Sequence, residues 1–525
     1  MRRHGFGAVA AVVAGTLLAA LAPGAPAAAA PAAALGRLAW QTCTDLQPQE
    51  GQRLECATLE VPLDRAPGGT GETVRLALSR VPARAERTGV LLVNPGGPGS
   101  PGRDWAAVTA GRLPDDLRDR YDVVGFDPRG TGASTPAIAC DPAYFAPVRP
   151  DTVPGDRAEE RVLLDRAASY ARACRRNSGE LLDHMRTVDS ARDMDAVRAA
   201  LGVERISYLG YSYGSYLGGV YATLFPQRVD RLVLDSNVDP GTPWYTANLA
   251  QSRALDAAAD NFFAWVAEHD DVYRLGGTVD QVRRRYYDVR AELAANPLQD
   301  RFGPTELEST FVLVAYHSAY WPVLAAALAG YATGKDPGAL VKAGADHGES
   351  ATTDPAHGAY LATQCTDSAW PRDPAVWRRD GRAVHAQAPF QGWNNIWYNA
   401  PCMYWPAQSG RWFQVDGSRT GGALLVHASD DGPTPIAGAY AMRQRFPGAR
   451  LVVEDGGVSH GVALSGNSCV DEAVLRYLRD GTLPEAVAAP GTDAADLSCA
   501  PRPEPTPRTA QAAADPFRVP IPVRP

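Results

Sequence analysis

The sequence has few of the features that mark nucleic-acid-binding or metal-dependent proteins. Lys335 and Lys342 are its only lysines, its 51 basic residues are outnumbered by 59 acidic ones, and its formal net charge is -8. Because a nucleic-acid-binding surface needs clustered cations, this balance argues against nucleic acid as a partner. No Cys-x-x-Cys pair occurs and the nine histidines are scattered. This disfavours a zinc site, and we expect no metal and no cofactor.

Long apolar runs and nucleotide-binding motifs are also missing from most of the chain. Beyond the first thirty residues, no run reaches the roughly 18 apolar residues that a membrane helix needs. We therefore expect no membrane contact after processing. The phosphate-binding pattern G-x-x-x-x-G-K-[ST] is absent, and there is no repeat of fixed period. The 525 residues, 45% of them hydrophobic, are instead enough for one large enzyme with an insertion or for several domains.

The first thirty residues have the pattern of a secretory signal peptide. A short basic segment precedes the apolar stretch Ala8 to Leu21, and the following Ala/Pro-rich stretch offers several small-residue cleavage sites. A transmembrane anchor is disfavoured, because the apolar run is short and no stop-transfer charge follows it. We expect residues 1–30 to be a signal peptide, residues 31–38 to be a possible pro-segment, and the mature protein to be secreted and extracellular.

Export would place the eight cysteines in an oxidising compartment, where an even number favours disulfides. Eight cysteines allow about 105 pairings, but their positions suggest that each cysteine pairs with the next along the chain. The predicted disulfides are Cys43–Cys56, Cys140–Cys174, Cys365–Cys402 and Cys469–Cys499. Each would close a loop or tie an excursion of the chain to its own neighbourhood.

Short apolar segments alternate with helical patterns in two parts of the chain, residues 39–240 and 420–500. The predicted strands are 73–81, 90–93, 121–127, 206–209, 231–235, 424–427 and 451–454. The predicted helices between them are 188–201, 213–225, 436–446 and 470–478. Such alternation predicts an α/β fold with a mostly parallel sheet covered on both faces.

Between residues 241 and 419 the alternation stops. This stretch is mainly helical over 247–268, 279–295 and 307–331, and is then irregular and rich in Trp, Pro and His. We interpret it as an insertion between two strands that forms a largely helical lid over the active edge of the sheet. The Pro-rich tail, residues 501–525, is expected to be disordered or loosely docked.

The segment ISYLGYSYGSYLGG contains the pattern G-x-S-x-G at residues 210–214, directly after a predicted strand and at the start of a predicted helix. This context is typical of a nucleophile elbow, in which a sharp turn exposes a serine hydroxyl at a helix N-terminus. Glycines must flank the serine to avoid steric clashes. Ser212 is therefore the predicted nucleophile.

A serine hydroxyl needs a base to remove its proton, and the base needs an orienting carboxylate. In α/β-hydrolases the three follow one another as Ser, acid and His. Downstream of Ser212, the loop after one predicted strand contains Asp430 and Asp431, and the loop after the next contains His460. We predict Asp431 as the acid, with Asp430 as the alternative, and His460 as the base. His427 is the rival base, but it lies within a strand.

The oxyanion formed during attack needs two backbone N–H donors. One is expected from Tyr213, the residue after the nucleophile, and the other from the glycine-rich segment NPGGPG that follows an early strand. That segment offers Gly96, Gly97 and Gly99, of which Gly97 is favoured. We interpret the nearby DPRGTGAS segment as structural, with Asp127 and Arg129 binding loop backbone and each other beneath the oxyanion loop.

Together, the motifs NPGGPG, DPRGTGAS, GYSYGSYLG, D-x-P-T-P and SHG, with a signal peptide and paired cysteines, resemble those of secreted bacterial tripeptidyl aminopeptidases. These enzymes are relatives of the proline iminopeptidases. The resemblance extends from Trp40 to Cys499 and implies an α/β-hydrolase core whose C-terminal segment carries the acid and the base. It also implies release of short peptides from free N-termini, with Ser212, Asp431 and His460 as nucleophile, acid and base.

Three functions are open at this point. The first is a secreted serine exopeptidase that releases short peptides, tripeptides foremost, through an acyl-enzyme; its partners would be peptides with a free N-terminus. The second is a secreted carboxylesterase that uses the same triad. The third, an inactive binding module, is disfavoured by the intact set of Ser, Asp and His.

A group that binds the substrate's ammonium would distinguish the peptidase from the esterase. Three lid acids, Glu349, Asp354 and Asp367, are candidates. Asp367 is preferred, because a disulfide at Cys365 would fix its position and because similar proteins carry an acid near this cysteine.

Overall fold

The computed structural model describes residues 38–66, 69–489 and 491–508. The predicted signal peptide, nearly all of the predicted pro-segment and residues 509–525 of the tail lie outside the described residues. The described chain contains a ten-stranded sheet in the order β1-β2-β3-β5-β4-β6-β7-β8-β9-β10. The strands are β1 Gln41–Thr42, β2 Glu55–Pro62, β3 Thr73–Val81, β4 Gly89–Asn94, β5 Tyr121–Phe126, β6 Ile206–Tyr211, β7 Val229–Asp235, β8 Leu424–Ala428, β9 Arg450–Glu454 and β10 Leu497–Cys499.

The predicted mostly parallel sheet is confirmed. Antiparallel pairing is confined to one side, where β1, β2, β3 and β5 pair in turn. From β5 onward every neighbouring pair is parallel, through β4, β6, β7, β8, β9 and β10. The loops that leave the parallel strands at their carboxyl ends therefore meet at one edge, where ligands bind in open α/β sheets.

Helices cover both faces of the sheet, and alternate strand residues point into the two layers. In β4, for example, Val90 and Leu92 belong to one hydrophobic core, whereas Leu91 and Val93 belong to the other. The first core is closed by α4 (Thr187–Ala200), α5 (Tyr213–Leu224) and α15 (Ala437–Arg445), and the second by α1 (Trp105–Arg112) and α16 (Ser468–Asp480). The short helix α2 (Asp115–Arg118) follows α1.

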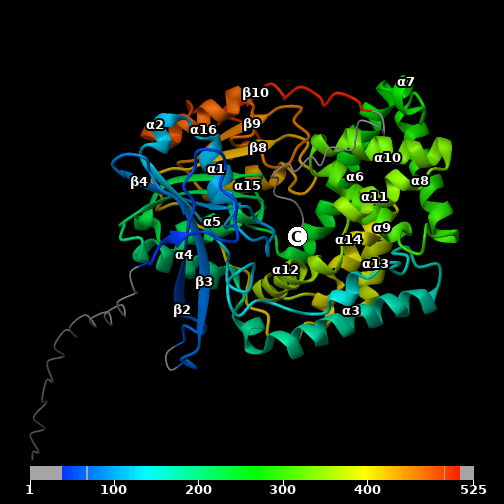
Figure 1. Cartoon of the computed structure of the whole chain (residues 1–525), viewed down its shortest axis with the longest axis horizontal. Helices are drawn as coiled ribbons and strands as arrows, with labels where there is room; N and C mark the ends of the chain where they lie inside the picture. The colour runs from blue at the N-terminus through cyan, green and yellow to red at the C-terminus, as the bar shows by residue number, and fades with distance from the viewer. Residues whose placement is uncertain (1–37, 67–68, 490, 509–525) are drawn as a thin grey trace, which may run out of the picture. The chain divides into compact units, whose positions relative to one another are not determined.

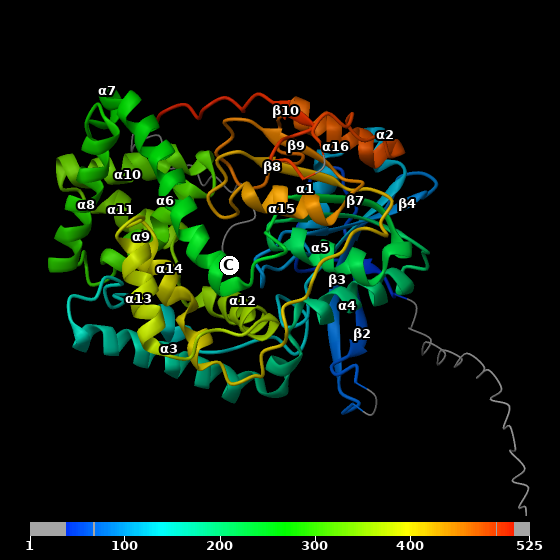
Figure 2. The same cartoon turned by 180° about the vertical axis from the view of Figure 1, so that it is seen from behind.

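The insertion between β7 and β8 is helical throughout much of its length and lies beside the sheet as a group of helices, α6 to α14 (Figures 1 and 2). Its first half has a hydrophobic core of its own. The helices of this lid are α6 Trp244–Glu268, α7 Asp270–Tyr273, α8 Val279–Ala295, α9 Pro304–Phe311, α10 Trp321–Gly334, α11 Gly338–His347, α12 Asp354–Asp367, α13 Pro374–His385 and α14 Gly392–Asn399.

Two expectations about the lid are wrong. The predicted continuous helix over 307–331 is interrupted by the short 3-10 turns η4 (Val312–Ala315) and η5 (Ser318–Tyr320), which bring the chain close to the sheet edge. The segment expected to be irregular instead contains α11 to α14. Several of its aromatic residues, such as Trp377 and Trp393, are buried in these helices. The amino-acid composition of the segment therefore did not reveal that it is helical.

A segment predicted as part of the sheet region also packs on the lid. Residues 141–178 leave the sheet, and α3 (Arg157–Ser178) lies along the lid helices (Figure 1). Arg149 donates to Glu306 at 2.9 Å, Trp397 donates to the carbonyl of Thr152 at 2.7 Å, and Arg378 pairs with Glu160 at 2.7 Å. The lid is therefore built from two stretches of the chain, one of which precedes Ser212.

The predicted sequential disulfides are confirmed. The structure contains Cys43–Cys56, Cys140–Cys174, Cys365–Cys402 and Cys469–Cys499, and no described cysteine is free. They close loops with sequence separations of 13, 34, 37 and 30 residues. Loops of this size correspond to about 3 to 4 kcal/mol of stabilisation each in the chain-entropy account.

The described part of the tail, residues 500–508, crosses from the sheet to the lid (Figure 1, red segment leaving β10). We call it the C-terminal strap. On the sheet side Arg502 pairs with Glu454 at 3.1 Å. On the lid side the carbonyl of Pro505 accepts from Trp265 at 3.2 Å, and the amide of Arg508 donates to the Tyr273 hydroxyl at 3.1 Å. This part of the tail is thus specifically docked, contrary to the expectation of disorder or loose docking.

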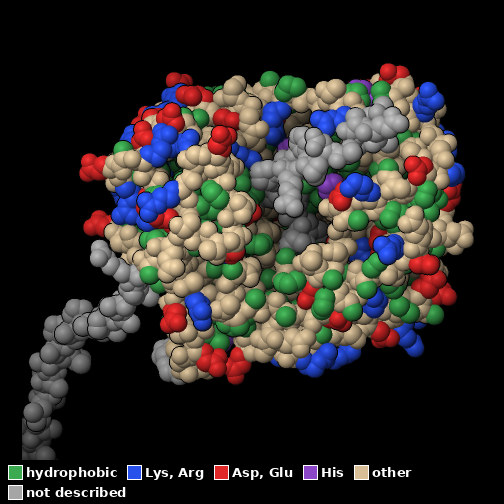
Figure 3. Space-filling view, viewed as in Figure 1, with side chains coloured by type: hydrophobic (Ala, Val, Ile, Leu, Met, Phe, Trp, Pro, Cys, Tyr) green, Lys and Arg blue, Asp and Glu red, His purple; other side chains and the backbone are tan. Residues whose placement is uncertain are grey.

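The surface of the described chain mixes charges of both signs. On the face shown in Figure 3, acidic and basic side chains are intermingled over both the sheet region and the lid. No helix in the described ranges is both long and apolar enough to cross a membrane.

Candidate active site

Ser212 lies in the sharp turn between β6 and α5, as the elbow pattern predicts. Its backbone has φ 57° and ψ -126°, a strained conformation for a residue with a side chain. A Cβ on Gly210 would lie 2.4 Å from the carbonyl oxygen of Gly214, and one on Gly214 would lie 2.9 Å from that of Asn94. Only glycine fits at these two flanking positions.

The glycine-rich loop after β4 lies directly against the elbow. A Cβ on Gly96 would lie 2.8 Å from the Cβ of Ser212 and 3.1 Å from the amide nitrogen of Tyr213. Gly97 and Tyr213 line the same cavity as Ser212. The structure therefore brings together the two residues predicted to donate to the oxyanion, and their role stays a prediction.

Asp431 and His460 form a buried hydrogen-bonded pair. The Nδ1 atom of His460 lies 2.8 Å from one Asp431 carboxylate oxygen and 3.0 Å from the other, and both side chains are fully buried. Thr434 supports the pair: its amide donates to Asp431 at 2.8 Å, and its hydroxyl lies 3.3 Å from the same Nδ1. Nε2 of His460 is buried and has no hydrogen-bond partner among the described residues, so it is the nitrogen available to a substrate-side proton.

The environment of Asp431 favours its ionised form. Burial alone would raise the pKa of this carboxyl, but the adjacent His460 imidazole, with help from His427 and the Thr434 amide, holds the pKa below the ordinary value. An ionised Asp431 orients the imidazole and stabilises its protonated form.

Asp430 and His427, the alternative acid and the rival base, do not take part in this hydrogen-bonded pair. Asp430 is exposed, and its carboxylate meets only the neighbouring Ser429 hydroxyl at 3.3 Å. His427 is fully buried in β8, where Nδ1 accepts from the amide of Asn237 at 2.9 Å and Nε2 lies 2.8 Å from the carbonyl of Thr434. Both ring nitrogens of His427 are thus engaged by backbone groups, and burial lowers its pKa.

The end of β7 holds the loop that carries His460, a contact that the motifs did not reveal. One carboxylate oxygen of Asp235 accepts from the amides of Val462 at 2.8 Å and Ala463 at 2.7 Å, and the Ser236 hydroxyl accepts from Gly461 at 2.8 Å. Complete burial raises the pKa of Asp235 to about 7. The only sequence signal for this role is an acid placed directly at the end of an apolar strand.

The lid also contacts both catalytic loops. The amide of His460 donates to the carbonyl of Tyr316 at 2.7 Å, and the Tyr316 ring stands nearly perpendicular to the imidazole with centroids 5.7 Å apart. A Cβ on Gly432, the residue after Asp431, would lie 2.6 Å from the carbonyl oxygen of Ala315. The turn between η4 and η5 therefore packs against the acid loop and the base loop together.

The DPRG segment lies beneath the glycine-rich loop, as expected, but its two charges do not pair with each other. Asp127 accepts from the amides of Gly102 at 2.8 Å, Arg103 at 3.1 Å and Ala133 at 2.8 Å. Arg129 pairs instead with Asp193 on α4, at 2.7 and 2.8 Å. The expected Asp127–Arg129 contact is wrong, because α4 supplies an acid that the local sequence does not contain.

A cavity of about 260 Å³ opens beside Ser212 between the sheet edge and the lid. Its walls are mostly apolar or neutral, and one acidic residue, Asp239, is among them. The lining residues are Gly97, Ser212, Tyr213, Asn237, Val238, Asp239, Thr242, Trp244, Thr246, Ala247, Asn248, Ala250, Gln251, Tyr316, Tyr360, Gln364, Pro433, Thr434, Pro435, Ala437 and Gly438.

None of the three predicted ammonium-binding acids is among these lining residues. Asp367 is buried behind Trp244, where its carboxylate accepts from Thr187 at 2.6 and 2.7 Å and from the Trp244 indole at 3.2 Å. Burial raises its pKa to about 6. Asp354 accepts from two backbone amides and from Tyr170, and Glu349 pairs with Arg149. This geometry gives Asp367 a supporting place behind the cavity wall.

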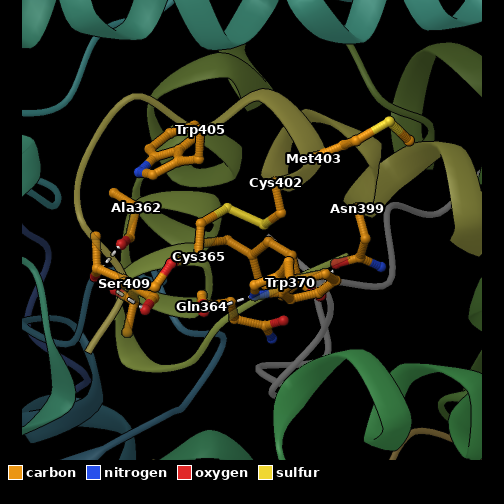
Figure 4. Close-up of a disulfide and its surroundings, with 12 residues drawn as sticks. Ala362, Gln364, Cys365, Trp370, Asn399, Cys402, Met403, Trp405 and Ser409 are labelled. Atoms are coloured by element: carbon orange, nitrogen blue, oxygen red, sulfur yellow. Dashed lines mark hydrogen bonds between the residues drawn. A yellow bond between two sulfur atoms is a disulfide. The ribbon is translucent and has the colours of Figure 1, made fainter. Parts of the chain in front are cut away.

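The Cys365–Cys402 disulfide fixes that wall (Figure 4). Cys365 lies on α12 next to Gln364, which lines the cavity, and Cys402 lies in the 3-10 turn η7 (Ala400–Tyr404). The carbonyl of Gln364 accepts from the Trp370 indole at 2.9 Å, and the carbonyl of Cys365 accepts from the Ser409 hydroxyl at 2.8 Å. The disulfide therefore joins two lid segments at the back of the cavity.

Comparison with known proteins gives matches over most of the chain. A family model for the alpha/beta hydrolase fold matches residues 89–459. The tripeptidyl aminopeptidase of Streptomyces coelicolor is 39% identical over 499 residues, which cover 93% of this chain and 90% of that protein. Serine protease Hip1 of Mycobacterium bovis is 30% identical, with 86% and 90% covered. Carboxylesterase B of Mycobacterium tuberculosis is 32% identical, with 88% and 90% covered.

Proposed function

The chain belongs to the α/β-hydrolase family, among the tripeptidyl aminopeptidases and their relatives, and we propose that it is a secreted exopeptidase that removes tripeptides from free N-termini. It is a serine hydrolase of the peptidase type. The observation that carries the proposal is the buried Asp431–His460 pair at the sheet edge that also carries Ser212. Four disulfides support export, since such bonds persist in oxidising compartments.

In the proposed reaction the Ser212 hydroxyl attacks the carbonyl carbon of the scissile peptide bond. His460 Nε2 takes the hydroxyl proton, and Asp431 stabilises the imidazolium that forms. The amides of Gly97 and Tyr213 donate to the oxyanion, each contributing about 3 kcal/mol. His460 then gives the proton to the leaving amine. A water molecule, deprotonated by the same imidazole, hydrolyses the acyl-enzyme and restores Ser212.

The cavity supports a short peptide as substrate. Lid residues line much of it, among them Tyr360 and Gln364 of α12 and Asn248 and Gln251 of α6. The amide side chains offer donors and acceptors to peptide backbone, whereas the apolar residues suit small apolar side chains. A cavity with this lining suits a short peptide segment beside Ser212.

A carboxylesterase is the second candidate, because the relative named carboxylesterase B is 32% identical over 480 residues. The same triad cleaves esters, and a mostly apolar cavity also accepts a neutral acyl group. The two functions differ in what they require at the far end of the substrate, where only the aminopeptidase needs a charged amine.

A substrate panel tests the proposal. The mature protein is incubated with Ala-Pro-Ala amides carrying free or acetylated N-termini, with di- and tetrapeptide analogues, and with a small neutral ester, and products are identified by mass spectrometry. We expect release of intact tripeptides, with acetylation slowing turnover at least about 10²-fold, a difference of about 3 kcal/mol. Equal rates on free and acetylated peptides, with faster ester cleavage, would favour the esterase.

A further inference from the structure

Asp239 is the one residue with a charged side chain among the described residues that line the cavity. No lysine or arginine is in the same set, so the described walls carry a single negative charge. A mostly apolar cavity of this charge attracts a ligand with a cationic end and an otherwise neutral body. It disfavours acidic peptides and anionic esters.

The position of Asp239 is fixed by the same strand end that holds the catalytic loops. The carbonyl of Asp235, at the end of β7, accepts from the amide of Ser212 at 2.9 Å. Val238 donates to the hydroxyl of Ser215 in the first turn of α5 at 3.0 Å. Asp239 follows immediately, at the start of the lid, and is partly exposed.

The Asp239 carboxylate keeps capacity for a ligand. One oxygen accepts from the amide of Gly241 at 2.8 Å and the other from the hydroxyl of Thr242 at 2.5 Å. A carboxylate has about four acceptor sites, so these two bonds fix its orientation and leave the others open. Within the described chain no ion pair with Asp239 is formed, although the Arg445 guanidinium lies near the same turn, 3.5 Å from where a Cβ on Gly241 would be.

We propose that Asp239 binds the α-ammonium group of the peptide substrate and so selects free N-termini. This deepens the proposed exopeptidase function and rests on it. The carboxylate accepts hydrogen bonds from the ammonium, while the Gly241 and Thr242 donors hold it in place. Binding in a mostly apolar cavity makes this charge-assisted contact stronger than it would be in water.

The test is Asp239→Asn, in which the side-chain oxygen still accepts from the turn but the charge is lost. We expect KM for a free-amine tripeptidyl amide to rise about 10- to 100-fold with little change in kcat. KM for the acetylated amide and for a small neutral ester should stay within about twofold. Asp64→Asn is the matched control, because Asp64 accepts from Ala66 at 2.8 Å in the same local geometry outside the cavity lining. Asp367→Asn is a second comparison, because it removes a carboxylate that lies behind the cavity wall and not in the cavity lining.

A second variant separates charge from turn structure. Thr242→Val removes one hydrogen bond to the carboxylate but keeps its charge, and should raise KM for the free-amine peptide far less than Asp239→Asn. The proposal is overturned if Asp239→Asn affects free and acetylated peptides equally, or if it leaves both KM values unchanged. If the unmodified enzyme itself does not distinguish free from acetylated peptides, the exopeptidase function fails as well.

Discussion

The sheet and the lid organise their residues in opposite ways. In the sheet, neighbouring residues of one strand serve two different cores, as Leu424 and Leu425 of β8 do. In the lid, α6 buries one helical stripe that includes Phe262, Phe263 and Val266 against its neighbours. The predicted catalytic residues Ser212, Asp431 and His460 all lie in turns or loops at the sheet edge, whereas most of the cavity wall comes from the start of the insertion and from α12.

This difference assigns the proposed chemical step to the sheet edge and the selection of substrate to the residues that line the cavity. The predicted nucleophile, acid and base each lie within a short motif at the end of a parallel strand, although Asp235 and Tyr316 also hold the loop of His460. The cavity depends on residues far apart in the chain, such as Asp239, Tyr316 and Gln364. The two regions meet where the Tyr316 carbonyl accepts from the amide of His460. Substitutions on either side of this boundary should have distinguishable effects.

The largest effect is expected at the sheet edge. Ser212→Ala should lower kcat by about 10⁴-fold or more, because no other group replaces the attacking oxygen. The fold should remain intact, since the elbow is held by backbone contacts and flanking glycines. Activity measurements beside a thermal unfolding curve test this. A folded variant that retains more than a few per cent of activity would contradict the assignment.

The next effect concerns two adjacent acids. Asp431→Asn should lower kcat by about 10³-fold or more, because a neutral amide neither fixes the tautomer of His460 nor stabilises its protonated form. Asp430→Asn is the matched control and should stay within about twofold, since this side chain is exposed. The measurement is kcat of both variants at the same pH. A similar decrease of kcat in both would reject Asp431 as the specific acid.

A smaller effect is expected where the lid meets the acid loop. In Gly432→Ala the new methyl group would lie 2.6 Å from the Ala315 carbonyl and 2.9 Å from the Ala258 methyl, so the loop and the lid must separate. We expect kcat to fall about tenfold. Gly421→Ala, whose methyl group meets nothing within 4 Å, should leave kcat unchanged. If both variants behave like the unmodified enzyme, the lid does not help to position the acid.

The smallest effect concerns stability rather than turnover. The pKa of Asp235 is raised from 3.8 to about 7 by burial, so between about pH 4 and pH 7 the folded protein holds a proton that the unfolded chain has released. The free energy of unfolding should therefore fall as pH rises through this range. From pH 5 to pH 8 the loss should be about 3 kcal/mol greater than in Asp235→Asn. Denaturant titrations at both pH values measure it, and parallel pH dependence in the two proteins would contradict the role of this carboxyl.

Much of the sheet region was predictable because its signals are local. The apolar alternation predicted β3 with its observed bounds. In the lid, the helical pattern likewise predicted α8 with its observed bounds. The elbow motif predicted where Ser212 lies because steric limits make glycine necessary on both sides of it. The order Ser, acid, His is the one that α/β-hydrolases use, and the parallel strands bring their loops to one edge.

The features that the sequence did not predict depend on contacts between segments that lie far apart in the chain. Asp193 of α4 replaces Asp127 as the partner of Arg129, and the choice depends on how α4 packs, which no local pattern records. Asp367 was favoured for its closeness to Cys365 in sequence, yet the disulfide places its carboxylate behind Trp244. Asp239 carries no sequence signal of a binding site, because an Asp-Pro-Gly segment is typical of an ordinary turn.

The C-terminal strap has a consequence for the order in which the molecule is made. Synthesis proceeds from the N-terminus, so Ser212 and its elbow exist well before Asp431 and His460 have been added. The hydrogen bonds that attach the strap to the lid come from Pro505 and Arg508, later still. A nascent chain thus carries the predicted nucleophile without the predicted base for much of its synthesis, and the hydrogen bonds between strap and lid form only after His460 has been added. A product truncated before residue 460 is expected to be inert.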